Sequence, residues 1–413
     1  VVSALGTQST SLVGSLSDEY LDLPILSVGS TAARSEARDE EGGGGYLLDV
    51  KPAILPQMKA LVRLVLDMKL ARDAVDGRSE PTEKVWLMHT SDTYGTTATA
   101  AFNAAANNIS VLLPETSSSD HSGSDDDGSE EPVRATVEVV GTLVLSASSE
   151  AIFDWEMATL IAEEASIVVL LAEGFDGSVV RSVLSQAFDA GITSGVQWFL
   201  PDVAAFDHIF DRNSTYRDAE LAFNMRGMLG LRTCVPRTAA AAHMALETIN
   251  ATGDGNFTGI ALDRCPFPTT GSWADGLVMR DSILSASTTL VGATGPLDMS
   301  IGEDDDGRDM ESVTFCAVNL KPHATQGARF ETISTLQGGE LEGENGEGFQ
   351  DISQFQEAQT FPQGALTYPS DRPILQGRHM DIVMRRDAPP FVFVDGDGTS
   401  NEDFTGITPE FVK

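Results

Sequence analysis

Hydroxyl-rich turns follow two apolar stretches near the start of the chain. Ser9 and Thr10 come after the first apolar stretch, and Ser30 and Thr31 come after Leu23–Val28. If both stretches are parallel strands, the two turns lie at the carboxyl ends of a sheet, where helix N-termini and free backbone N–H groups favour small polar or anionic ligands. The opening of the chain therefore predicts half of a binding cleft. Helix capping is the alternative role for these hydroxyls.

Polar residues also follow strand-like segments further along the chain. Tyr94 lies in the turn after Lys84–Thr90, and Asp202 follows Val196–Leu200. Glu173 comes at the end of another apolar stretch. Carboxylates at strand ends can supply the counter-charge that a buried ammonium group requires. These residues are candidates for a second side of the same binding site.

The sequence contains no clear signature of an enzyme or of a metal site. The chain contains no H-E-x-x-H, no G-K-[ST] phosphate loop and no G-x-S-x-G elbow. Asp395–Gly398 begins like a calcium loop but lacks glycine at the sixth position, and Asp304–Asp306 is more typical of a solvated turn. We therefore expect a protein that is not an enzyme and that holds no metal or cofactor.

The composition indicates a globular, strongly acidic protein. The 413 residues are 41% hydrophobic and carry a formal net charge of -36. This charge disfavours binding to nucleic acid or to an anionic membrane through the surface. No apolar run approaches the roughly 20 residues of a membrane-spanning helix. We expect any membrane attachment to come from segments outside this chain.

The pattern of apolar residues predicts an α/β protein. Between Val137 and Leu200, strand-like and helix-like segments alternate, which is typical of a parallel sheet covered by helices on both faces. Helical spacing also marks Pro56–Met68. Residues 115–131 contain seven acids among Ser and Gly, and we expect this segment to be a disordered insertion.

The cysteines and the N-glycosylation sequons indicate the cellular compartment in which the protein folds. A Cys234–Cys265 bridge is favoured if the compartment is oxidising, with Cys316 as a buried free thiol. Four N-x-[ST] sequons favour a secreted, glycosylated surface. They lie at Asn108, Asn213, Asn250 and Asn256.

Three segments carry a resemblance to a known family. ALGTQSTSLVGSLSDEYLDLPILSVGSTAARS near the start, WLMHTSDTYGTTATAAFNAA from Trp86 and GATGPLDMSIGEDDDGRDMESVTFCAVNL from Gly292 resemble receptor ligand-binding domains with the type I periplasmic-binding-protein fold. The family includes natriuretic-peptide receptors, class C G-protein-coupled receptors and the amino-terminal domains of ionotropic glutamate receptors. From Leu375, LQGRHMDIVMRRDAPPFVFVDGDGTSNEDFTGITPEFVK resembles the start of the type II module of ionotropic glutamate receptors.

The resemblance implies a bilobed α/β fold with two doubly wound parallel sheets and a hinge, in which lobe 1 is incomplete at the N-terminus. The implied domains are a ligand-binding domain at 1–337, a linker at 338–374 and a truncated type II module at 375–413. Within the first, lobe 1 comprises 1–83 and 236–291, and lobe 2 comprises 84–235 and 292–337. The chain then looks like a fragment of a longer receptor.

The same resemblance implies a function. It predicts an extracellular sensor, ionotropic-glutamate-receptor-like, whose lobes close on a small ligand and which oligomerises through lobe 1. An ectodomain of a class C receptor or receptor guanylate cyclase, or a soluble secreted binding protein, are the alternatives. In the family the residue at Tyr94 packs on the ligand. Val50–Ile54 lacks the acid that amino-acid-sensing relatives carry there, so an amino-acid-like ligand stays open.

Overall fold

The computed structural model describes two units, Val1–Pro369 and Ser370–Lys413. The description covers part of each unit. It comprises residues 2–3, 7–17, 24–27, 47–49, 54–76, 81–112, 134–148, 150–173, 178–193, 195–210, 221–234, 276, 280–281, 283, 291–292, 295–296, 313–323, 327–337, 349, 393–394 and 404–405. The predicted acidic insertion at 115–131 lies outside these residues.

A small parallel sheet opens the chain. Strands β1 (Val2–Ser3), β2 (Ile25–Ser27) and β3 (Leu47–Asp49) lie in that order, and both neighbouring pairs are parallel. Helix α1 (Thr7–Leu16) connects β1 with β2. Because this connection joins parallel neighbours, the strand–helix–strand unit predicted for the start of the chain is confirmed.

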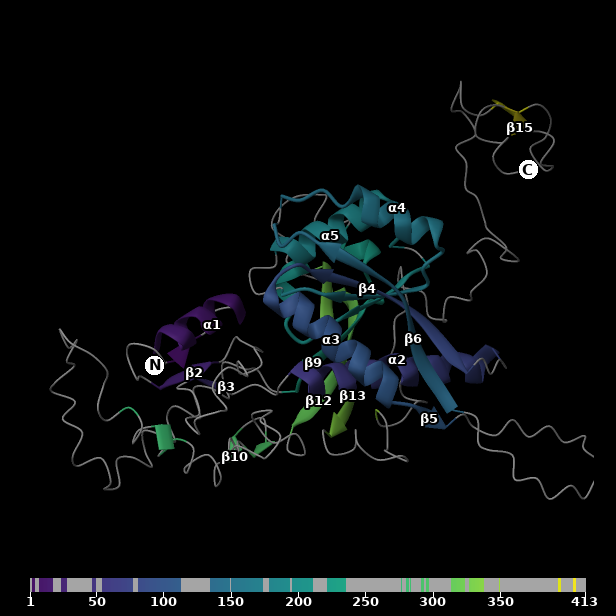
Figure 1. Ribbon diagram of the computed structural model, residues 1–413. Coiled ribbons are helices and arrows are strands. Elements are labelled where there is room, and N and C mark those ends of the chain that lie inside the picture. The colour runs from purple at the N-terminus through teal and green to yellow at the C-terminus, as the bar shows by residue number, and fades with distance from the viewer. Residues whose placement is uncertain are drawn as a thin grey trace, which may run out of the picture. The chain divides into compact units, whose positions relative to one another are not determined.

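A mixed eight-stranded sheet forms the main body of the first unit (Figure 1). Its order is β13-β12-β9-β8-β7-β4-β6-β5. Strands β4, β6, β7, β8 and β9 run parallel, whereas β5, β12 and β13 pair antiparallel with their neighbours. The strands are β4 (Thr82–Thr90), β5 (Val111–Leu112), β6 (Arg134–Leu145), β7 (Ile167–Leu171), β8 (Gln197–Leu200), β9 (Leu229–Thr233), β12 (Thr314–His323) and β13 (Gly327–Gln337). The predicted α/β class with helix-covered parallel strands is confirmed.

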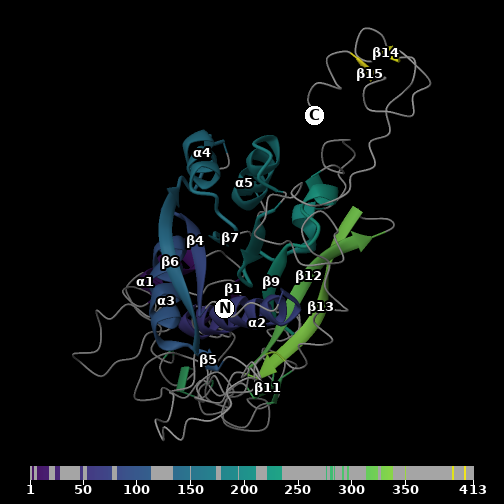
Figure 2. The ribbon, with the colours of Figure 1, turned by 90° about the vertical axis from the view of Figure 1, so that its right-hand side faces the viewer.

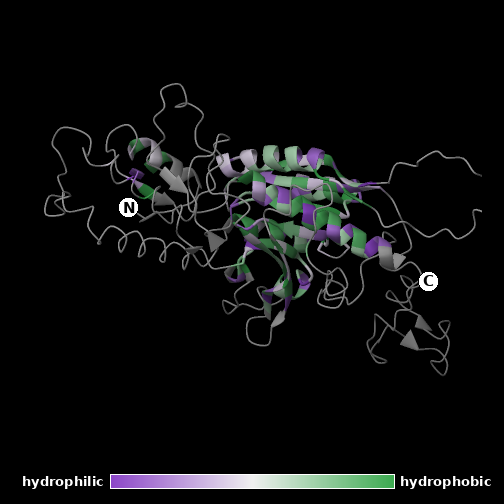
Figure 3. Cartoon of the chain, turned by 90° about the horizontal axis from the view of Figure 1, so that it is seen from below, coloured by the Kyte–Doolittle hydropathy of each residue, from purple (hydrophilic) through white to green (hydrophobic). Residues whose placement is uncertain are grey.

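Helices cover both faces of the eight-stranded sheet (Figure 2). Helices α2 (Ile54–Asp76) and α3 (Thr93–Asn108) belong to one hydrophobic cluster, and α4 (Asp154–Ala162) and α5 (Ser178–Asp189) belong to the other. Strand β7 contributes alternate residues to the two clusters, because successive side chains of a strand point to opposite faces. The strands between the helices are accordingly rich in hydrophobic residues (Figure 3).

Helix α2 extends well beyond the predicted Pro56–Met68. All side chains from Ile54 to Asp73 are buried or half-buried. Phe349, in the range predicted as a linker, is also buried in the α2 cluster, and its backbone N–H donates to Asp67 Oδ2 at 2.9 Å. At this point the predicted linker is tied to the folded unit.

Shorter elements complete the description. They are the 3-10 helix η3 (Asp207–Phe210), the antiparallel pair β10 (Val291–Gly292) and β11 (Gly295–Pro296), and, in the second unit, the antiparallel pair β14 (Phe393–Val394) and β15 (Phe404–Thr405). Among the described residues, no helix combines the length and apolar character needed to span a membrane. The lobe boundaries and the type II module stay predictions.

Candidate functional site

The strand order defines one special position in the sheet. The parallel strands read β6-β4-β7-β8-β9, which is the 2-1-3-4-5 order of doubly wound sheets. Helix α3 leaves β4 toward one face, and α5 follows β7 on the other. The chain therefore diverges at the carboxyl ends of β4 and β7. In open α/β sheets, ligands bind at this switch point.

The carboxyl end of β4 leads directly into α3. Asp92 is the N-cap of the helix: its Oδ1 accepts the backbone N–H of Gly95 at 2.8 Å and the hydroxyl of Thr90 at 2.9 Å. A Cβ on Gly95 would lie 2.0 Å from the carbonyl oxygen of Thr90, so only glycine lets the helix begin this close to the strand. The Asp92 carboxylate is thus engaged in holding the turn.

Tyr94 lies in the first turn of α3 and is buried. It is 1% exposed and belongs to the same hydrophobic cluster as α2. In this structure its ring therefore acts as part of the core, and its contact with a ligand stays a prediction.

Strands β7 and β8 are each followed by an acidic residue at the same edge of the sheet. Glu173 follows the buried strand β7 after Ala172 and is half-buried. Asp202 follows β8 after Pro201, is 2% exposed, and accepts the backbone N–H of Thr233 on its Oδ1 at 3.4 Å. The parallel pairing of β4, β7 and β8 brings both residues to the sheet edge that also holds Asp92.

The segment after β8 is tied down across the neighbouring strand. The backbone N–H groups of Ala204 and Ala205 both bond to the carbonyl of Pro201, at 2.9 and 3.0 Å. The Arg232 guanidinium on β9 donates to the Ala205 carbonyl and pairs with Asp207 at 3.1 Å. These bonds fix the loop that carries Asp202.

This edge of the sheet is acidic. The described residues of the segments after β4, β6, β7 and β8, namely 91–92, 146–148, 150–153, 172–173 and 201–206, include no Lys, Arg or His. The acids among them are Asp92, Glu150, Glu173 and Asp202. A ligand held here meets carboxylates, of which Asp92 and Glu173 are half-buried. The Asp92 carboxylate caps α3, and the neighbouring cation Arg232 is paired with Asp207.

The predicted lobe 1 residues are placed only in part. Ser9 and Thr10 lie in the first turn of α1, after the carboxyl end of β1, and their side chains are outside the described residues. Ser30 and Thr31 lie outside the described residues altogether.

Asn108 is the exposed last residue of α3, so its sequon is accessible. The other three sequons, at Asn213, Asn250 and Asn256, also lie outside the described residues.

The predicted cysteine pairing is wrong. Cys234 bonds to Cys316, not to Cys265, with a Cα–Cα distance of 4.9 Å. The physical reason is the antiparallel pairing of β9 with β12, in which Cys316 is opposite Arg232 and the Cys234 N–H bonds to the Thr314 carbonyl. The pairing of β9 with β12 brings together two cysteines that are 82 residues apart in sequence, although the expected Cys234–Cys265 bridge would have closed a shorter loop. Cys316 is therefore not a free thiol.

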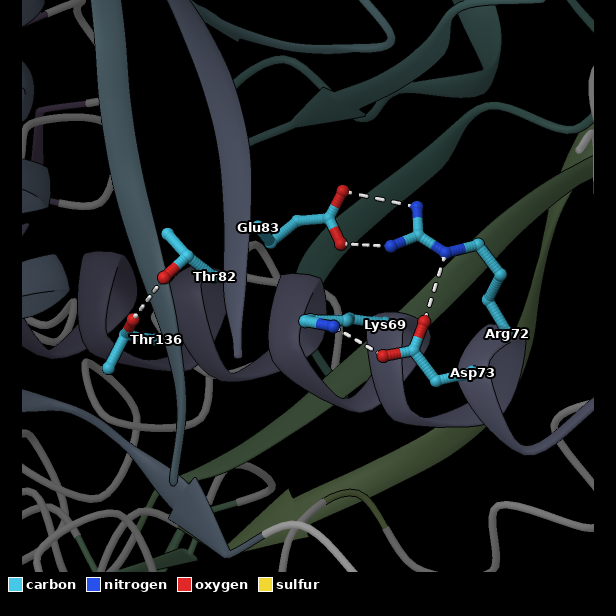
Figure 4. Close-up of polar contacts among 6 residues, drawn as sticks. All are labelled: Lys69, Arg72, Asp73, Thr82, Glu83 and Thr136. Atoms are coloured by element: carbon cyan, nitrogen blue, oxygen red, sulfur yellow. Dashed lines mark hydrogen bonds and ion pairs between the residues drawn. The ribbon is translucent and has the colours of Figure 1, made fainter. Parts of the chain in front are cut away.

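A buried charge network on α2 was not predicted (Figure 4). Lys69 pairs with Asp73, and Arg72 binds Glu83 of β4 through two nitrogens, one at 3.1 Å from Oε1. Arg72 Nε also lies 3.4 Å from Asp73 Oδ1. Burial raises the pKa of the Glu83 carboxyl, and the Arg72 guanidinium opposes the shift. The i,i+4 spacing of Lys69 and Asp73 was the available signal in the sequence.

A second pair on α2 holds Phe349. Arg63 Nε lies 2.9 Å from Asp67 Oδ1, and the other carboxylate oxygen accepts the Phe349 N–H. Burial raises the pKa of the Asp67 carboxyl, while Arg63 lowers it to a lesser extent. The first network joins α2 to the next strand, β4, whereas the second joins α2 to Phe349, 282 residues from Asp67. Among the described residues, no group of three or more His, Cys, Asp or Glu is placed to hold a metal.

Comparison with known proteins gives similar solved structures but no matching family. No family model matches the chain, and no curated protein matches it. One of these structures is a solute-binding protein of an ABC transporter from Rhodopseudomonas palustris BisB5 in complex with 3,4-dihydroxybenzoic acid. The chain is similar to it with a TM-score of 0.47 and 11% identity, over 80% of this chain and 77% of that one. The bound acid is a property of that protein alone.

Proposed function

We propose that this chain is a ligand-binding domain whose ligand is a small molecule with a positively charged group. The observation that carries the proposal is the acidic edge at the β4/β7 switch point, where Glu173 is half-buried and no basic residue occurs in the four adjoining segments. An ammonium group removed from water needs a counter-charge. A ligand amine beside Glu173 satisfies this need, and the absence of an acid at Val50–Ile54 is then compensated from this edge.

We propose further that the domain is the extracellular sensor of a receptor, and the motif resemblance to ionotropic glutamate receptors supports this choice. The Cys234–Cys316 bond supports an oxidising compartment, because structural disulfides persist mainly outside the cytosol. The exposed sequon at Asn108 is accessible to glycosylation.

A thermal-shift screen tests the ligand class. The panel contains small primary amines and amino acids, each beside its N-acetylated counterpart, which keeps the remaining groups but lacks the charge. The proposal predicts that a free amine raises the melting temperature and that its acetylated partner does not, since binding to the folded state stabilises it. Equal shifts for the two members of every pair would contradict it.

Substitutions then place the ligand. Glu173→Gln removes the charge at the switch point, while Glu138→Gln makes the same change at an exposed position on β6. We expect the first to weaken amine binding by about 1–3 kcal/mol and the second to leave it unchanged. If both variants, or neither of them, lost the ligand-induced rise in melting temperature, the ligand would bind at another site.

An N-glycosylation experiment tests the proposed extracellular location. The chain is directed through a secretory pathway and treated with a glycosidase that removes N-linked sugars. A mobility shift that Asn108→Gln reduces is expected, and a chain without sugar at Asn108 would count against the extracellular assignment.

A further inference from the structure

Helix α4 presents a line of apolar side chains to solvent. Ile152, Trp155 and Ile161 are 77%, 69% and 51% exposed, and Ala158 between them is also exposed. These four residues are called the α4 stripe below: Ile152 precedes the helix, and Trp155, Ala158 and Ile161, three apart, form a row inclined to its axis. Met157 and Leu160 are buried in the core, so Trp155 lies on the outward side of the helix and Ile161, four residues after Met157, lies at its flank.

The exposure of the stripe is fixed by the structure around it. Gln186 of α5 accepts the Phe153 N–H at 2.7 Å and donates to the Ala151 carbonyl at 2.9 Å. Phe153 itself is 1% exposed. Ile152 therefore lies between two anchored residues, with its side chain exposed.

Acidic residues surround the stripe. The segment 150–164 contains no Lys, Arg or His. Its acids are Glu150, Asp154, Glu156, Glu163 and Glu164. Glu163 and Glu164 follow the C-terminal end of α4, where negative charge is unfavourable, and Glu164 also adopts a positive φ of 49°. These two acids therefore do not serve the stability of the helix.

We propose that the α4 stripe docks a cationic amphipathic segment of a partner protein. Charge complementarity selects this occupant, because apolar residues of the segment would cover Trp155 and the isoleucines while its Lys and Arg side chains meet the acidic rim. A second copy of the chain brings the same acids face to face on a net charge of -36. An anionic membrane is repelled for the same reason. Trp at the centre of a patch with a polar rim is the usual arrangement of an energetic hot spot.

The test measures binding of a synthetic peptide to the full 413-residue chain by fluorescence anisotropy. The peptide has about 18 residues of Leu and Lys at helical spacing. One control peptide replaces Leu with Ser and keeps the charge, and the other replaces Lys with Glu and keeps the apolar face. The proposal predicts binding of the first peptide and much weaker binding of both controls.

Protein variants separate the stripe from the general acidity of the chain. Trp155→Ala keeps every charge and is expected to weaken binding about tenfold or more. Phe223→Ala removes another exposed aromatic, 56% exposed and stacked on Arg226, and is expected to change nothing. Glu163→Gln with Glu164→Gln is expected to weaken binding and to reduce its dependence on salt. Circular dichroism of each variant checks that the fold is kept.

Several outcomes overturn the proposal. Equal binding by Trp155→Ala and the unchanged chain removes the stripe from the interface. Equal binding of either control peptide would show that the partner does not need both positive charge and an apolar face. A dimer in sedimentation that Trp155→Ala dissociates assigns the stripe to a second copy, and Trp155-dependent binding to vesicles of anionic lipid assigns it to a membrane.

Discussion

Arg72 of α2 and Glu83 of β4 form a two-pronged ion pair that joins a helix to the first strand of the large sheet. One nitrogen lies 3.1 Å from Glu83 Oε1, and both side chains are nearly buried. Removing one member leaves the other charge buried without its main partner. We expect Arg72→Met to lower the free energy of unfolding by about 3–5 kcal/mol in chemical denaturation.

The double variant Arg72→Met with Glu83→Leu is the control for this pair. Because it leaves neither charge behind and keeps Lys69–Asp73, it is expected to lose clearly less stability than Arg72→Met alone. A double variant that loses the full sum of the two single changes would show that the residues do not act as a pair.

Asp67 gives a pH dependence with a defined sign. Burial raises its pKa above the ordinary 3.8, so the folded state binds a proton more readily than the unfolded state does. The contribution of this carboxyl to stability is therefore present at low pH and is lost as pH rises through the raised value. Relative to Asp67→Asn, the unchanged protein should become less stable as pH rises above 3.8. Denaturation curves across that range measure the difference, and a difference of opposite slope would contradict the assignment.

The Cys234–Cys316 disulfide can be tested by peptide mapping and by the loss of stability when it is reduced. Peptide mapping without reduction should find Cys234 joined to Cys316 and Cys265 outside this bridge. Because the bond closes a loop with a sequence separation of 82, reduction should lower the free energy of unfolding by about 4.5 kcal/mol in the chain-entropy model. A Cys234–Cys265 peptide in the map would restore the pairing expected from the sequence.

Gly95 and Gly191 form a matched pair of glycines. A Cβ on Gly95 would clash with the Thr90 carbonyl oxygen at 2.0 Å, whereas Gly191 has a φ of 75° and nothing within 4 Å of its added Cβ. Gly95→Ala should therefore cost about 3 kcal/mol or more, and Gly191→Ala about 1 kcal/mol. Equal losses in thermal and chemical unfolding would show that the close start of α3 does not depend on glycine.

Sequence patterns were sufficient for the local elements. Apolar periodicity predicted the alternating strands and helices from Val137 to Leu200, and the S-D-T-Y-G segment at 91–95 located the turn that Asp92 caps. The switch point followed once the strand order was known, because Glu173 and Asp202 both come directly after parallel strands.

Contacts between distant segments could not be predicted in the same way. The Cys234–Cys316 bond depends on β9 pairing with β12, and Phe349 reaches Asp67 across 282 residues. The full length of α2 was also missed, because its charges look like a solvent-exposed face until Glu83 and Phe349 are placed against them. In each case a tertiary contact, not local propensity, decided the outcome.

Ligand binding at the β4/β7 switch point is tested most directly by hydrogen–deuterium exchange of the full chain with the best primary amine from the thermal-shift panel. The amine is expected to slow exchange at the residues that follow β4, β7 and β8, around Asp92, Glu173 and Asp202. Glu173→Gln should abolish that protection at the same amine concentration. Protection confined to other parts of the chain, or unchanged in Glu173→Gln, would contradict a cation-binding site at this edge.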